Sequence, residues 1–139
     1  MKTVITFCLC LILSLSASAQ DCFPDGIKFR NQSDVDNFII NNPTCKEIIG
    51  TLEVSENSTI TNLEGLKNIE VIKGDFIVWT SLILQNFQGM NNLKSVEGTF
   101  RVQHCDNLKS FVGLNNLQTV YNFSFTNNNN LLDSCGLLK

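Results

Sequence analysis

Residues 71 to 79 read VIKGDFIVW, and residues 96 to 102 read VEGTFRV. In each stretch apolar residues alternate with others around one glycine, and a phenylalanine follows that glycine by two positions. Gly74 and Gly98 are 24 positions apart, and Gly50 lies another 24 positions upstream. The stretches are therefore predicted to be successive copies of one repeating unit, called a coil below.

The 24-residue spacing aligns apolar residues along the whole coil. A second glycine column comprises Gly65, Gly89 and Gly113, and an asparagine column comprises Asn68, Asn92 and Asn116. So many coincident positions indicate a true repeat. The apolar columns are Ile48, Ile72 and Val96; Leu52, Phe76 and Phe100; Val54, Val78 and Val102; Ile60, Leu84 and Leu108; Leu63, Phe87 and Phe111; Leu66, Met90 and Leu114; Ile69, Leu93 and Leu117.

The first part of each coil alternates with period two, as a half-buried strand does. One coil alone cannot bury its apolar side, whereas stacked coils can, and each large side chain buried in this way contributes about 1.5–3 kcal/mol. We predict a mainly β protein, a short right-handed parallel β-solenoid with an N-terminal capping helix. Its units begin near residues 48, 72, 96 and 120, and the last unit loses one residue after Asn122.

The chain opens with MKTVITFCLCLILSLSASAQ. Lys2 gives a positive start, an apolar run follows, and Ala17-Ser18-Ala19 matches a cleavage signature. Because the run is too short to span a bilayer, we predict a signal peptide over residues 1–19; the alternative is a membrane anchor. The remaining chain is expected to be one secreted or extracellular domain, possessing a cap over residues 20–47 and repeats over 48–139.

Charge excludes one class of partner. The chain has 10 basic and 13 acidic residues, a net charge of −3, and no basic run. Nucleic-acid binding therefore has no electrostatic basis in this sequence. No stretch after residue 19 is apolar enough over sufficient length to span a membrane.

A helix is expected over residues 33–42, SDVDNFIINN, as the cover for the first coil. Ser33 is its expected N-cap, and Pro43 ends it. Its apolar face is formed by Val35, Phe38 and Ile39.

Four cysteines follow residue 19. Cys22 precedes the expected helix and Cys45 follows it, so a disulfide between them would close the cap in an oxidising compartment. Cys105 and Cys135 fall on different sides of the predicted coils, and we expect no bond between them.

Several segments together resemble the receptor L-domain type of leucine-rich β-helix. They are CFPDGIKFRNQSDVDNFIINNPTCKEIIGTLEV, ITNLEGLKNIEVIKGDFIV and LKSFVGLNNLQTVYNFSF, and the ending NNNNLLDSCGL is similar to the closing coil of bacterial secreted surface proteins of this kind. The resemblance spans residues 22 to 139. It implies a non-enzymatic, extracellular recognition or surface role.

Catalytic residues are sparse. His104, the only histidine, stands beside Cys105 and Asp106 in a turn, where a nucleophilic or metal-binding pair is one interpretation. The other is an exposed turn histidine, because adjacent turn residues generally point apart. We therefore expect no enzyme, metal or cofactor.

Outward positions of the strands are predicted to form two exposed rows. Trp79 and Ile77, beside Arg101 and Gln103, have the composition of a contact site. In the alternative interpretation a loop or the cap covers Trp79. The candidate ligand-binding residues are Glu53, Ser55, Ile77, Trp79, Arg101 and Gln103.

Two functions fit this pattern. In the first, the chain is a recognition module that binds an extracellular protein or a glycan through its exposed sheet face. In the second, it is a structural or adhesive repeat that stacks on other chains, homo-oligomers included, through its C-terminal coil.

Overall fold

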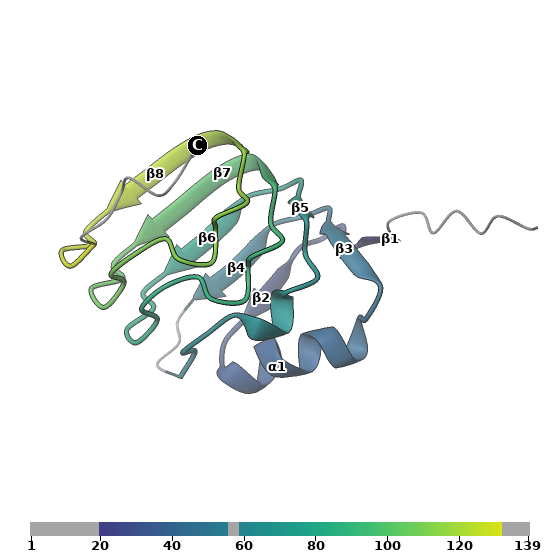
Figure 1. The fold of residues 1–139 in the computed structure, drawn as a ribbon, viewed down its shortest axis with the longest axis horizontal. Helices are drawn as coiled ribbons and strands as arrows, with labels where there is room; N and C mark the ends of the chain where they lie inside the picture. Colours follow the sequence, from purple (N-terminus) through teal and green to yellow (C-terminus); the bar gives the residue numbers. More distant parts are fainter. Residues whose placement is uncertain (1–19, 56–58, 132–139) are drawn as a thin grey trace, which may run out of the picture.

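The computed structural model describes residues 20–55 and 59–131. The chain is mainly β, with one parallel sheet of eight strands and one α-helix (Figure 1). The elements in chain order are β1 (Gln20–Cys22), β2 (Ile27–Phe29), α1 (Gln32–Asn41), β3 (Cys45–Ile48), β4 (Leu52–Ser55), the 3₁₀ helix η1 (Glu64–Leu66), β5 (Val71–Ile72), β6 (Phe76–Trp79), β7 (Ser95–Gln103) and β8 (Thr119–Thr126).

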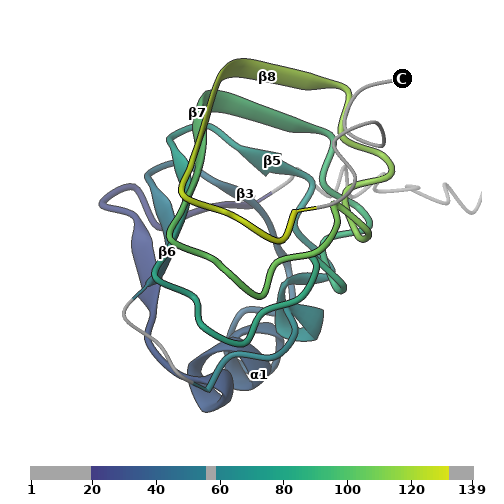
Figure 2. The same ribbon diagram turned by 90° about the vertical axis from the view of Figure 1, so that its left-hand side faces the viewer.

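The sheet has two rows of short strands, β1-β3-β5 and β6-β4-β2, and both rows pair with the long strand β7. Its order is β1-β3-β5-β7-β6-β4-β2, with β8 also paired to β7. In the earlier coils each pass contributes two separate strands, whereas β7 and β8 run without interruption through both rows. Figure 2 shows successive passes of the chain lying one behind another. The sheet is parallel throughout and is not closed.

The strand register confirms the repeat. Leu52 pairs with Phe76, and Phe76 pairs with Phe100, so each partner lies one coil further along the chain. The last coil departs from the prediction. Asn122 pairs with Thr99, so the missing residue precedes Asn122 and does not follow it.

The interior is formed by the predicted apolar columns, and every member of the seven columns is buried. Phe76 and Phe100 stack with their ring centroids 4.8 Å apart and their planes within 4°. Phe87 and Phe111 stack in the same way, at 5.9 Å. Edge-to-face contacts from Phe87 to Phe76 and Phe100 join the two stacks, an arrangement that aromatic rings favour.

The glycine columns allow the coils to approach closely. A Cβ atom on Gly74 would lie 2.5 Å from the carbonyl carbon of Gly50. Gly89 and Gly113 have φ angles of 107° and 102°, and a Cβ on Gly89 would lie 2.2 Å from the carbonyl carbon of Leu63. Only glycine satisfies both the space and the backbone conformation at these two positions.

The asparagine column ties each coil to the one before it. The side-chain amide nitrogen of Asn68 donates to the Pro43 carbonyl at 3.0 Å, and that of Asn92 donates to the Lys67 carbonyl at 2.8 Å. Asn116 donates in the same way to the Asn91 carbonyl at 2.7 Å. These carbonyls lie in turns, where no strand partner is present. The side-chain amide therefore replaces the ladder hydrogen bond that the turn lacks.

Helix α1 lies at the N-terminal end of the sheet (Figure 1). Its N-cap is Asn31, whose side-chain oxygen accepts from the Asp34 amide at 2.9 Å. The prediction of Ser33 as the cap is therefore wrong, because the helix begins at Gln32 and places Ser33 inside the first turn. Val35 and Phe38 are buried as expected, while Ile39 is only partly buried.

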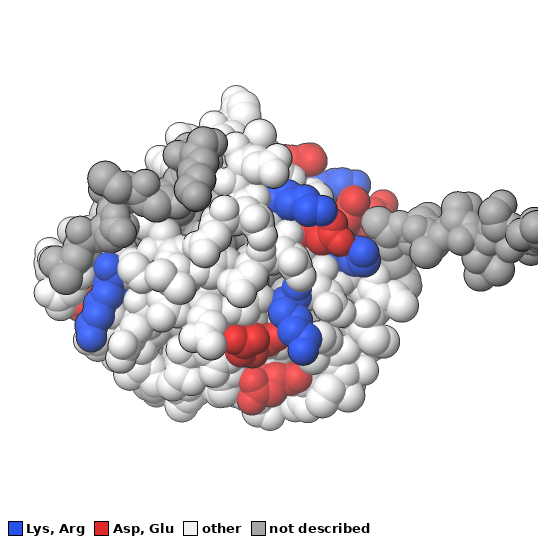
Figure 3. Space-filling view, viewed as in Figure 1, with Lys and Arg blue, Asp and Glu red and all other residues white. Residues whose placement is uncertain are grey.

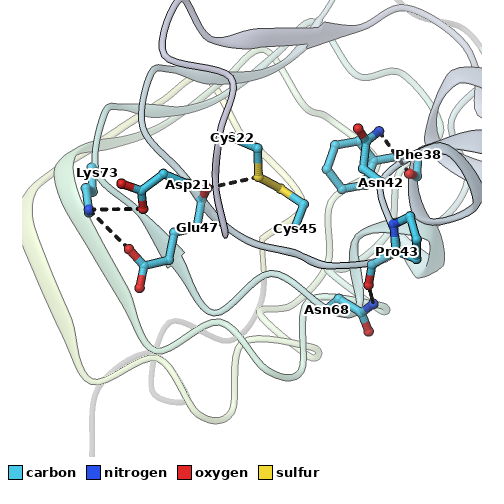
Figure 4. The surroundings of a disulfide bond; sticks show 9 residues. All are labelled: Asp21, Cys22, Phe38, Asn42, Pro43, Cys45, Glu47, Asn68 and Lys73. Atoms are coloured by element: carbon cyan, nitrogen blue, oxygen red, sulfur yellow. Dashed lines mark hydrogen bonds and ion pairs between the residues drawn. A yellow bond between two sulfur atoms is a disulfide. The ribbon is translucent and has the colours of Figure 1, made fainter. Parts of the chain in front are cut away.

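Phe38 closes the N-terminal end of the interior. Its ring lies 5.6 Å from the rings of both Phe23 and Phe29, measured between centroids. Cys22 and Cys45 form the predicted disulfide, with Cα atoms 6.1 Å apart (Figure 4). Cys105 is a free, buried cysteine, and the prediction concerning Cys135 lies outside the described residues.

The segment predicted as a cap also contains strands. β1 pairs with β3 and β2 pairs with β4, so this segment is itself the first coil of the sheet. The 24-residue spacing misses β2 because Ile27 pairs with Leu52, an offset of one residue from the repeat.

Charged side chains gather in small mixed groups separated by uncharged surface (Figure 3). In one group Glu70 accepts from Lys46 at 2.9 Å and from Lys94 at 2.5 Å, so three successive coils are joined by charge. Hydrogen bonds from Lys94 and Lys46 hold the pKa of Glu70 below its ordinary value. In another group Lys73 contacts Asp21 and Glu47 (Figure 4).

Replacing Phe100 by Ala should lower the free energy of unfolding by about 3–5 kcal/mol, because its ring contacts four others and the cavity cannot collapse. The matched control is Tyr121→Ala, which removes a ring that is 85% exposed and should change stability by less than about 0.5 kcal/mol. Urea denaturation followed by circular dichroism measures both. Equal losses in the two variants would contradict the stacked aromatic interior.

Replacing Gly89 by Ala should destabilise the protein by more than the roughly 1–3 kcal/mol that a strained φ costs, since the new Cβ also meets the Leu63 backbone. Asn91→Ala, at an exposed neighbouring site, is the control. Differential scanning calorimetry gives both melting temperatures. A Gly89→Ala protein with the melting temperature of the wild type would show that neighbouring coils do not lie as close at Gly89 as described.

Replacing Glu70 by Gln should cost up to about 1 kcal/mol near neutral pH, the usual scale for exposed ion pairs. The folded state lowers the pKa of Glu70, so the wild-type advantage is present above the ordinary carboxyl pKa and disappears as the pH falls through the lower, folded value. Urea unfolding at a series of pH values measures this difference. Glu97→Gln, an exposed residue that forms no ion pair with the described residues, should show no comparable trend.

Candidate binding face

The predicted outward rows lie on adjacent strands. Glu53, Ile77 and Arg101 occupy matching positions of β4, β6 and β7, and the row continues to Ser124 on β8. These four strands lie side by side (Figure 1). The second row consists of Ser55, Trp79, Gln103 and Thr126.

Trp79 stands at the centre of the two rows. Its side chain is 45% exposed, and it is the only tryptophan in the sequence. Gln103 is its direct neighbour on β7, and Ile77 lies two positions earlier on its own strand. Ile77, Arg101 and Gln103 are each partly exposed.

Two of the six predicted site residues are engaged within the protein: Ser55 is buried, and Glu53 is partly exposed but paired. Ser55 is fully buried, so the prediction that it is exposed is wrong. Its short side chain is held against its own strand, where the hydroxyl donates to the Glu53 carboxylate at 2.6 Å. Glu53 is also paired with Lys28 at 3.2 Å.

The Glu53 carboxylate is electrostatically satisfied. Burial alone would raise the pKa of Glu53, but the hydrogen bonds from Ser55 and Lys28 outweigh that effect, and the pKa lies below its ordinary value. Glu53 therefore remains ionised, with its charge balanced by Lys28. It forms a neutral border to the site.

The remaining residues have polar groups that the protein does not use. Within the described residues, the side chains of Trp79, Arg101 and Gln103 take part in no hydrogen bond or ion pair. The name "binding face" is used below for Ile77, Trp79, Arg101, Gln103, Ser124 and Thr126.

A corner borders the binding face where the strands end. Thr80, His104 and Asn127 follow its second row in successive coils, and all three have positive φ angles, between 53° and 55°. His104 is exposed, and its Nε2 lies 3.4 Å from the amide nitrogen of Asn127. The sequence pattern did not identify this corner, because its members share a backbone conformation and no side-chain type.

The His104–Cys105 pair does not form a joint site. His104 is exposed, whereas Cys105 is buried and its sulfur lies 3.3 Å from the Gln103 carbonyl oxygen. Burial raises the pKa of the Cys105 thiol, which opposes formation of the nucleophilic thiolate. Asp106 is held by the Asn129 amide at 3.2 Å.

A groove of about 490 Å³ lies elsewhere, between β2 and α1 at the N-terminal end. Its lining includes the aromatic side chains of Phe23, Phe29 and Phe38 and the polar residues Asp34 and Asn37. The sequence predictions did not include it, since Phe38 was assigned only to the cap.

Neither a cluster of metal ligands nor a known relative indicates a more specific function. In the described part of the chain, no three or more His, Cys, Asp or Glu side chains are grouped to hold a metal ion, and no helix there has the length and apolar character needed to cross a membrane. No protein-family model, no curated protein and no solved structure matches this chain.

Proposed function

We propose that the chain is a secreted or cell-surface, non-catalytic recognition module that binds an extracellular partner through the binding face. The observation that carries the proposal is the exposure of Trp79, the last residue of β6, on a strand that is hydrogen-bonded to β4 on one side and to β7 on the other. A tryptophan left in water on a rigid surface is the residue type most often found at the energetic centre of an interface. Its neighbours add an apolar side chain, a cation and an amide within one strand spacing.

We further infer that the stacked coils form a right-handed β-solenoid of the receptor L-domain type. The parallel register one coil apart, the capping helix and the Cys22–Cys45 disulfide support this assignment. Solenoids of stacked repeats generally use extended sheet or loop surfaces for recognition. An extracellular location is supported by the signal-like residues 1–19 and by a disulfide, which persists in oxidising compartments.

Replacing Trp79 by Ala should weaken capture of the partner, with little effect on folding because the side chain is on the surface. Wild type and variant are compared by biolayer interferometry against a panel of immobilised extracellular glycans and matrix proteins. Removing a central aromatic anchor is expected to weaken binding by about 2 kcal/mol or more, roughly thirtyfold.

Tyr121→Ala is the matched control, because it removes an exposed aromatic ring on β8 from a position outside the two rows of the binding face. If both variants bind as the wild type does, the binding face is not the recognition site. The structural alternative predicts a different result. Oligomers that grow with concentration in analytical ultracentrifugation and do not change on Trp79→Ala would support stacking on other chains and contradict recognition.

A further inference from the structure

We propose that the binding face recognises an acidic polysaccharide, whose carboxylate pairs with Arg101 while a neighbouring sugar ring lies on the indole of Trp79. This inference rests on the proposed function and names its ligand class.

Arg101 differs from the other basic side chains of the described residues. Lys28, Lys46, Lys73 and Lys94 are each in an ion pair, and the remaining described basic residues apart from Arg101 are exposed. Arg101 is partly buried and forms no ion pair with an acidic side chain in the described part of the chain, where the adjoining coils place Ile77 and Ser124 beside it.

A guanidinium in this setting favours an external anion. It is less hydrated than an ammonium, and its planar fork matches the two oxygens of a carboxylate. The nearest acidic side chain of the rows, Glu53, is already balanced by Lys28 and so offers little repulsion. The protein as a whole is slightly acidic, with a net charge of −3. Attraction of an anion to the binding face would therefore come from Arg101 and not from the overall charge.

The surroundings of Arg101 suit a sugar. The exposed indole of Trp79 provides a flat apolar surface for the C–H face of a pyranose ring. Gln103, Ser124 and Thr126 provide amide and hydroxyl groups for sugar hydroxyls. The strand spacing of about 4.8 Å and the rise of about 3.3 Å per residue separate Trp79 from Arg101 by roughly 8 Å along a diagonal, a distance that neighbouring units of one glycan chain can span.

A folded protein partner fits this surface less well. Stable protein interfaces bury about 800 Å² on each side around an apolar core. In the binding face only Trp79 and Ile77 are apolar, and Ile77 is partly buried. A small apolar platform surrounded by uncommitted polar groups matches a glycan better.

The test uses trigalacturonic acid and its fully methyl-esterified form, with EDTA present to prevent bridging by divalent cations. Because Trp79 is the only tryptophan, its fluorescence reports binding at this face directly. The wild type should bind the acid more tightly than the ester. Arg101→Gln should weaken binding of the acid by about tenfold or more, the scale of a lost charge-assisted hydrogen bond, and should bind both forms equally.

Controls separate charge from stability. Lys109→Gln removes the same charge from an exposed site outside the binding face and should leave the affinity unchanged. Arg101→Lys should retain part of the preference for the acid, because it keeps the charge but loses the fork. Melting temperatures of the variants should match that of the wild type.

The possible outcomes distinguish this inference from the proposed function. Equal binding of acid and ester by the wild type, or an Arg101→Gln protein with unchanged affinity, overturns the acidic-glycan inference. A partner protein that binds in a Trp79-dependent way, with no sugar bound, overturns the glycan inference and supports the proposed function. Binding of any ligand that ignores Trp79→Ala overturns the proposed function itself.

Discussion

Two columns of glycine permit neighbouring coils to lie as close as adjacent strands of a sheet. At Gly74 and Gly89 the space that a side chain would need is occupied by the backbone of the preceding coil. Without this approach the parallel ladder could not continue through the corners, and equivalent residues would not stack. The close packing in turn brings the phenylalanine rings to stacking distance.

Stacking also determines the surface. Each coil contributes two outward positions to the rows on β6, β7 and β8, so Trp79, Gln103 and Thr126 become neighbours although they are far apart in sequence. The backbone under these residues is held by the full parallel ladder. A side chain on such a support loses little further conformational freedom when it binds, which favours recognition by a small number of residues.

Much of the fold was predictable because a fixed spacing is converted directly into contact. The buried columns and the parallel register follow from this rule. The Cys22–Cys45 bond was predicted separately, from the positions of the two cysteines before and after the helix. The departures occur where local geometry overrides the spacing. Strand β2 is offset by one residue from the repeat. Asn31 caps the helix in place of Ser33, so the helix begins two residues earlier than a Ser33 cap would allow.

The site was predictable only in part. The period-two pattern of the strands predicts which side chains point outward. It correctly placed Ile77, Trp79, Arg101 and Gln103 on one face. Exposure does not follow from period two, since it depends on which neighbouring groups cover each outward position. Ser55 occupies an outward position yet is buried, and the positive φ angles of Thr80, His104 and Asn127 have no signature in side-chain type.

The position of the disulfide has a mechanical consequence. Cys22 and Cys45 enclose strand β2 and helix α1. When the chain is stretched, tension crosses directly from one sulfur to the other, and the enclosed segment carries no load. Pulling can therefore detach the later coils one at a time, while the loop that covers the N-terminal end stays shielded from the force until the covalent link is reduced.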